Sequence, residues 1–158
     1  MPVLSNELRE WLQPGLAGVL ATADASGSPE IARVFAYHAA TDQDAIQLWL
    51  LRSTADKIVR NLAAGARAAF NAIEIPSYRS RTFKGWGTVV RDISEADGAL
   101  IVECLAAMGR SFARVGMRDD AVARMIAHAG EDRSWVSVLL CVDSVYDQSP
   151  KPGAGARL

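Results

Sequence analysis

The sequence contains few of the residues from which metal centres are built. Only two cysteines and two histidines occur among its 158 residues. His38 and His128 stand far apart, and no cluster has the spacing of a zinc site, so we predict no bound metal. Cys104 and Cys141 lie in apolar segments distant from each other. Two buried free thiols in a reducing compartment are favoured over the alternative, a disulfide.

The chain also lacks an excess of either charge. Its 17 Lys and Arg residues nearly balance its 18 Asp and Glu residues. Such a balance produces no long-range field that attracts nucleic acid or an acidic membrane, so an anion must be held locally. No apolar run reaches transmembrane length, and the start MPVLSNELREW is not built like a signal peptide. We expect a cytoplasmic protein with no nucleic-acid or membrane partner.

Half of the residues are apolar, which suits one domain over residues 1–147 with a tail at 148–158. Helical patterns cover residues 5–13, which Ser5 caps, and 54–64, which Gly65 ends. Most strands follow each other as hairpins, so we predict a mainly β fold with α helices (α+β), a six-stranded antiparallel barrel with peripheral helices. The strands span residues 16–23, 30–39, 45–51, 67–75, 80–92 and 134–146.

A helical insert of about residues 94–129 precedes the last strand. Ser94 and Asp97 predict a capping box at its start. Apolar residues then recur at helical spacing, at Leu100, Ile101, Cys104, Leu105 and Met108. A second helix from about Asp119 shows another apolar face, made of Val122, Met125, Ile126 and Ala129.

The stretch LRSTADKIVRNL joins a buried strand to a helix. In the simpler interpretation, Ser53 is the N-cap, Asp56 completes a capping box, and Lys57 points into water. In the functional interpretation, the helix N-terminus is an anion site. Ser53 and Thr54 then add hydroxyl donors, and Arg52 and Lys57 add positive charge. Asp56 would compete with the anion unless it faces away.

Arg33 interrupts an apolar strand face. In EIARVFAYHA, alternation predicts that Ile31, Arg33, Phe35 and Tyr37 share one face. The Arg33 guanidinium either extends over the sheet, which is the usual case, or meets an anion beside it.

Polar residues also mark the segment YRSRTFKGWG, which otherwise resembles a strand. Arg79, Arg81 and Thr82 either protect an edge strand by their charge and polarity or contact a ligand. Gly85 and Gly87 flank Trp86, which indicates a bulge or a close backbone approach.

These three segments together resemble the FMN-binding split-barrel proteins related to pyridoxamine 5'-phosphate oxidase. The resemblance covers about residues 16–92. It implies a homodimer with FMN in a cleft between the subunits. It also implies that Arg33, the run Arg52-Ser53-Thr54, and Lys57 hold the phosphate. Further cofactor contacts are expected at Val34, Ser80 and Thr82.

The sequence departs from the oxidase at several functional positions. His38 stands where the oxidase has a lysine, and Ser80 stands where it has a glutamine. The ending VYDQSPKPGAGARL replaces the segment that grips pyridoxine. We therefore expect a substrate other than pyridoxamine phosphate. In the insert, Arg110, Arg114 and Arg118 surround Phe112; a solvated helix face is favoured over a site for an acidic substrate.

Two functions fit these features. The first is an FMN-dependent oxidoreductase acting on a small-molecule redox substrate, in which the cofactor performs the redox step. No catalytic His–Asp or Cys–His arrangement is evident in the sequence. This fits an enzyme whose cofactor performs the reaction, and it fits the second function equally. The second is a non-catalytic protein that binds or handles flavin or haem. We favour FMN over the alternatives F420 and haem.

Overall fold

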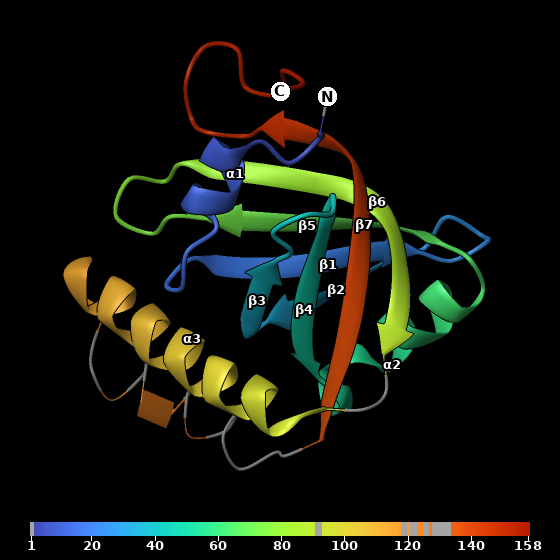
Figure 1. Ribbon diagram of the computed structural model, residues 1–158, viewed down its shortest axis with the longest axis horizontal. Helices are drawn as coiled ribbons and strands as arrows, with labels where there is room; N and C mark the ends of the chain where they lie inside the picture. The colour runs from blue at the N-terminus through green and yellow to red at the C-terminus, as the bar shows by residue number, and fades with distance from the viewer. Residues whose placement is uncertain (1, 91–92, 118–119, 121–122, 125–126, 128–133) are drawn as a thin grey trace.

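The computed structural model describes residues 2–90, 93–117, 120, 123–124, 127 and 134–158. Its strands are β1 (Ala17–Ala23), β2 (Pro29–Val34), β3 (Ala36–Ala39), β4 (Ala45–Leu51), β5 (Arg67–Ile73), β6 (Ser80–Val90) and β7 (Trp135–Asp147). Its helices are α1 (Asn6–Trp11), α2 (Arg52–Ala63) and α3 (Glu95–Arg114). The strands form one antiparallel sheet in the order β2-β1-β5-β6-β7-β4-β3 (Figure 1). The sheet curls until β2 packs against β4, which makes an open barrel.

The mainly β class is confirmed. We expected six strands, but the described part of the chain forms seven. The segment predicted as one strand over residues 30–39 divides at Phe35. Before it, β2 pairs with β1; after it, β3 pairs with β4. The Phe35 N–H donates to the carbonyl of Trp49 at 2.9 Å, so the chain changes partner at this residue. Local alternation does not reveal such a change, because it depends on which strand lies alongside.

The hydrophobic core lies on both sides of β4. Inside the curled sheet, Leu48 and Leu50 pack with Phe70 and Phe83. On the opposite face of β4, Trp49 packs beneath α3. Because successive side chains of a strand point to opposite faces, a strand covered on both sides must be almost continuously apolar. This explains the sequence AIQLWLL.

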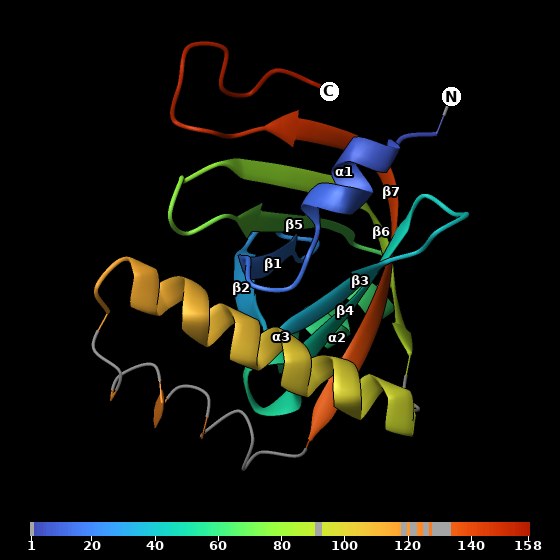
Figure 2. The same cartoon turned by 60° about the vertical axis from the view of Figure 1, so that its left-hand side comes forward.

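Helix α3 is the described part of the predicted insert, and it lies along one side of the barrel, where it contacts β3 (Figure 2). The capping box at Ser94 is confirmed: its hydroxyl accepts the Asp97 N–H at 3.2 Å, and the Asp97 carboxylate accepts the Ser94 N–H at 2.7 Å. The apolar face is confirmed too, with Ile101, Cys104, Leu105 and Met108 buried and Leu100 packed against them.

The second predicted helix falls largely outside the described residues, as do the positions Arg118, Val122, Met125, Ile126, His128 and Ala129. None of the helices within the described ranges is long and apolar enough to cross a membrane.

The two cysteines lie in different environments. Both thiols are free; Cys104 is buried, but Cys141 is exposed, so the expectation that both are buried was wrong for Cys141. Cys104 lies on the buried face of α3, where burial raises the pKa of its thiol. Cys141 points outward from β7, opposite the exposed Trp86 of β6. An apolar sequence neighbourhood does not show which side of a strand faces the core.

The C-terminal tail folds back along β7, and both chain ends lie at the same end of the barrel (Figures 1 and 2). The Leu158 N–H donates to the Val145 carbonyl at 2.9 Å. The Asp147 carboxylate accepts the Ser149 N–H at 2.8 Å and forms ion pairs with Arg81 at 2.8 Å and Lys151 at 2.9 Å. Hydrogen bonds from Ser149 and the neighbouring cations hold the pKa of Asp147 well below its usual range.

Candidate functional site

Helix α2 begins directly where β4 ends, without a linker. The N-cap is Leu51, which provides no side-chain hydrogen bond, so the predicted capping box from Ser53 to Asp56 was wrong. The Thr54 hydroxyl instead donates to the Leu51 carbonyl at 3.1 Å. The extended chain becomes helical one residue earlier than Ser53, which places Ser53 inside the first turn. The Arg52 N–H, at the start of α2, donates to the Ser134 carbonyl at 2.8 Å. The N-cap Leu51 offers the helix no side-chain hydrogen bond, so the amides that follow in the first turn, at the positive end of the helix dipole, suit an anion.

Lys57 is mostly exposed and lies beside β2. Its Nζ is 3.1 Å from Oε2 of Glu30. Lys57 also makes a small contribution to the lowered pKa of Asp24, after the larger effects of hydrogen bonds from Ser26 and Ser28. The lysine therefore faces the β1–β2 hairpin.

Arg33 lies on the outer face of the sheet. Exposed and buried residues alternate along β2, with Ile31 and Arg33 outside and Ala32 and Val34 inside. The predicted shared face was wrong for Tyr37, which is buried with the residues inside the barrel. Phe35 is buried as well, but it packs with Trp49 beneath α3, on the outer side of the sheet. The buried Val34 side chain leaves only its backbone available to a ligand.

A polar row crosses the outer face from Arg33. Val19 of β1 pairs with both Arg33 and Asn71, and Asn71 pairs with Thr82 of β6. The Asn71 amide donates to the hydroxyls of Thr82 at 2.9 Å and Ser80 at 3.1 Å. Asn71 thus joins the two predicted residues of β6 to the row that contains Arg33. Sequence reasoning missed Asn71; its position on an apolar strand, RAAFNAI, was the available signal.

A shallow groove of about 260 Å³ follows this row. Phe112 from α3 forms its far wall, so the insert contributes to the same surface as Arg33. Sequence reasoning placed Phe112 only among arginines, because its contact with the sheet is entirely tertiary. The groove is lined by Ala17, Gly18, Val19, Arg33, Asn71, Ile73, Ile75 and Phe112.

The predicted phosphate residues thus approach β2 from two sides. Lys57 meets the inner face through Glu30, whereas Arg33 projects from the outer face. Because β2 is an edge strand of the sheet, both faces of the sheet end at its unpaired edge. Within the part of the chain that the structure describes, the side chains of Arg33 and Arg52 form no ion pair. Two unpaired cations and one weakly held lysine therefore lie around the start of α2 and the edge of β2.

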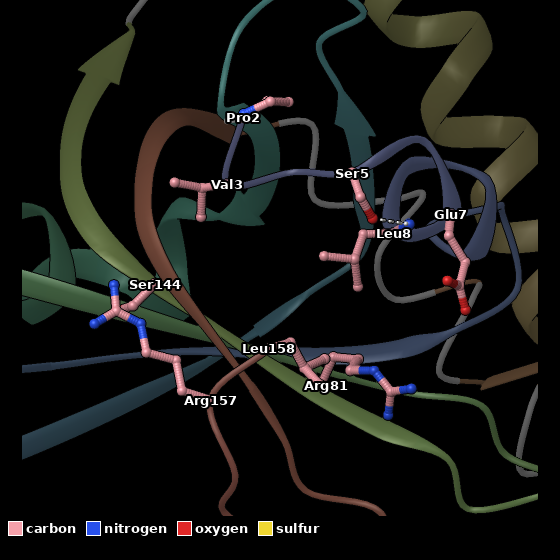
Figure 3. A pocket seen from close by; sticks show the side chains of 9 residues that line it. All are labelled: Pro2, Val3, Ser5, Glu7, Leu8, Arg81, Ser144, Arg157 and Leu158. Carbon is pink, nitrogen blue, oxygen red and sulfur yellow. Dashed lines mark hydrogen bonds between the residues drawn. The ribbon is translucent and has the colours of Figure 1, made fainter.

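A larger hollow, of about 420 Å³, lies away from all of these residues (Figure 3). It is bounded by the N-terminal segment, β6, β7 and the tail. Its Arg81 is already paired with Asp147, and its Ser5 hydroxyl accepts the N–H of Leu8 at 3.3 Å. The side chains drawn in Figure 3 are Pro2, Val3, Ser5, Glu7, Leu8, Arg81, Ser144, Arg157 and Leu158.

No protein-family model and no curated protein matches this sequence. Solved structures do match its fold. A candidate pyridoxamine 5'-phosphate oxidase from Lactobacillus delbrueckii has a TM-score of 0.55 at 19% identity, covering 90% of this chain and 93% of its own.

Two further solved structures have the same fold as this chain. A protein of the pyridoxine phosphate oxidase family from Clostridium acetobutylicum, related to general stress protein 26, has a TM-score of 0.51 at 13% identity, with 92% and 85% covered. An F420 reductase has a TM-score of 0.51 at 16% identity, with 87% and 94% covered. The fold is therefore the split barrel of pyridoxamine 5'-phosphate oxidase-like proteins.

Proposed function

We propose that this protein binds FMN and uses it as an oxidoreductase on a small-molecule redox substrate other than pyridoxamine phosphate. The observation that carries the proposal is the group of cations at the start of α2 and the edge of β2. Arg33 and Arg52 have no ion-pair partner within the described residues, and Lys57 has one carboxylate. Three exposed cations that share a single carboxylate partner within the described residues, in a chain with a net charge of −1, fit a local anion site.

The phosphate would be held by the start of α2, with Arg52, Ser53, Thr54 and Lys57, and by Arg33 from the edge of β2. Backbone amides at a helix start attract anions, and a guanidinium or ammonium adds charge-assisted hydrogen bonds. When bound, the flavin ring supplies the hydride or electron transfer. The residues of this chain bind and orient it.

The groove beside Arg33 suits the flat, largely apolar body of such a ligand. Val19, Ile73 and Phe112 provide apolar contacts, and Asn71 provides a polar group. The hydrogen bonds that Asn71 donates to Ser80 and Thr82 fix the orientation of its amide. A fixed amide loses little conformational freedom on binding, which favours affinity.

We further propose that the protein is a homodimer with the flavin at the subunit interface. The groove is shallow, and Ile31, beside Arg33 on the outer face, is 61% exposed. A second copy placed over this face would cover both. Paired subunits related by a two-fold axis are the commonest arrangement of this kind.

The decisive experiment is an absorption and fluorescence titration of the purified protein. We expect a yellow protein, or one that binds added FMN with quenched fluorescence, and light scattering that reports a dimer. A colourless protein that ignores micromolar FMN but takes up haemin with a Soret band, or binds F420, would overturn the FMN assignment. Flavin binding without reduction by any tested donor would instead support the non-catalytic alternative. Pyridoxamine phosphate should be turned over negligibly.

A further inference from the structure

The ion pair between Lys57 and Glu30 is one of two side-chain contacts that join α2 to the β1–β2 hairpin. On α2, Lys57 and Asn61 are four residues apart and therefore lie on one face. On the hairpin, Glu30 and Thr22 are direct cross-strand partners. Lys57 meets Glu30 at 3.1 Å, and the Asn61 amide donates to the buried Thr22 hydroxyl at 2.9 Å. The second contact anchors α2 against β1 and keeps Lys57 within reach of Glu30.

This arrangement places a carboxylate beside a cation of the candidate phosphate site. The Glu30 side chain is 29% exposed and that of Lys57 is 68% exposed, so both remain accessible to a ligand. No other ion pair is formed by the cations of this site within the described ranges. An anion that binds Lys57 must therefore displace Glu30 or accept its repulsion.

We propose that Glu30 is a specificity-determining residue: it pairs with Lys57 and competes with the flavin phosphate for it. The inference rests on the proposed function. Glu30 lowers the affinity for FMN but not for riboflavin, which lacks the phosphate. It therefore sets how strongly the protein prefers the phosphorylated flavin, and keeps the cofactor exchangeable.

The test is Glu30→Gln, which retains the size and hydrogen-bonding capacity of the side chain and removes its charge. An exposed ion pair contributes at most about a fivefold effect, and removing direct repulsion adds to it. We expect the dissociation constant of FMN to fall about threefold to tenfold, while that of riboflavin stays within a factor of about two. Fluorescence titration measures both.

A matched control is Glu74→Gln. Glu74 forms a similar exposed ion pair with Arg79, at 3.6 Å. It follows Ile73, at the opposite end of the β1–β5 pairing from Thr22, so it lies away from Lys57 although its neighbours line the groove. This variant should bind FMN like the wild type. Thermal unfolding of both variants shows whether either substitution disturbs the fold. A gain of FMN affinity in the control as large as that of Glu30→Gln would overturn the inference, because the effect would then be one of net charge.

The double variant Glu30→Gln/Lys57→Ala separates competition from general repulsion. If Glu30 acts through Lys57, Glu30→Gln changes FMN affinity less than about twofold once Lys57 is absent. An equal gain in both backgrounds contradicts the competition. If Lys57→Ala weakens FMN binding but Glu30→Gln leaves it unchanged or weaker, this inference alone fails. If the wild type binds no FMN, the proposed function and this inference fall together.

Discussion

Cations are arranged differently at the two ends of the barrel. At the tail end, Arg81 and Lys151 both pair with the buried carboxylate of Asp147. At the opposite end, around α2, Arg33 and Arg52 have no ion-pair partner within the described residues, and Lys57 has the single partner Glu30. The comparison separates cations that stabilise the fold from cations that remain available. The residue type alone does not distinguish the two.

The largest expected effect is on stability at the tail end. Asp147→Asn leaves Arg81 without its buried partner, and such a loss costs about 3 kcal/mol. Urea unfolding at pH 7 measures this free energy, and FMN affinity should not change. Asp143→Asn is the control, because Asp143 pairs with Arg67 at the surface and should cost less than about 1 kcal/mol. Equal costs for the two variants would remove the distinction between the tail cluster and an ordinary surface pair.

The Asp147 carboxylate should also make the free energy of unfolding depend on pH in the acidic range. Its pKa is lowered in the folded protein, so its contribution is present above the unfolded pKa of about 3.9 and is lost as the pH falls toward the folded value. The difference in unfolding free energy between the wild type and Asp147→Asn should therefore narrow below about pH 4. Urea unfolding at pH 7 and pH 3 provides the comparison. A difference that is constant over this range would contradict the role of Asp147.

At the α2 end, a change should affect binding and leave stability alone. Lys57→Ala removes one charge-assisted contact, so FMN should bind about tenfold to a hundredfold more weakly. Riboflavin affinity should scarcely change, and added salt should weaken FMN binding to the wild type more than to the variant. Titrations at two salt concentrations measure this. Equal losses for FMN and riboflavin would mean that the site is disturbed generally.

Arg33→Gln tests which part of the ligand meets the outer face. Arg33 projects toward the groove, and Lys57 lies on the other side of β2, so their effects need not be alike. If the Arg33 guanidinium contacts the phosphate, FMN binds about tenfold more weakly and riboflavin is unaffected. We expect this result. A loss of stability with unchanged flavin selectivity would show that Arg33 only covers the sheet.

The smallest expected effect comes from the insert. Phe112→Ala removes the apolar wall of the groove, so FMN and riboflavin should both bind about twofold to fivefold more weakly. Val102→Ala is the control, because Val102 lies on the same helix but is 67% exposed. Competitive titration with both flavins provides the measurement. No difference between the two variants would exclude α3 from the site.

The sequence predicted best where local signals decide the structure. The bounds of β4 followed from an almost continuous apolar run after the polar turn at residues 41–44, and the start of α3 followed from the Ser94 capping box. The predictions from the sequence were wrong where long-range contacts decide the structure. The strand break at Phe35 depends on a change of partner, and the start of α2 depends on β4 continuing directly into a helix.

The candidate site shows the same division. The resemblance and the chemistry of LRSTADKIVRNL indicated Arg52, Ser53, Thr54 and Lys57, which the structure gathers in the first two turns of α2. Asn71, Phe112 and Glu30 were not predicted. Each belongs to another element and reaches the site only through the pairing of β1 with β5, the packing of α3, or the contact of α2 with β2.

The direct passage from β4 into α2 limits how this chain can vary in length. Each residue of an α-helix turns by about 100°, so one residue inserted between Leu51 and Arg52 would rotate Lys57 away from β2 or pull α2 out of its packing. The exposed turn at Gly27 has no such coupling. In a set of random single-residue insertions, the hairpin turn should accept many and the junction almost none.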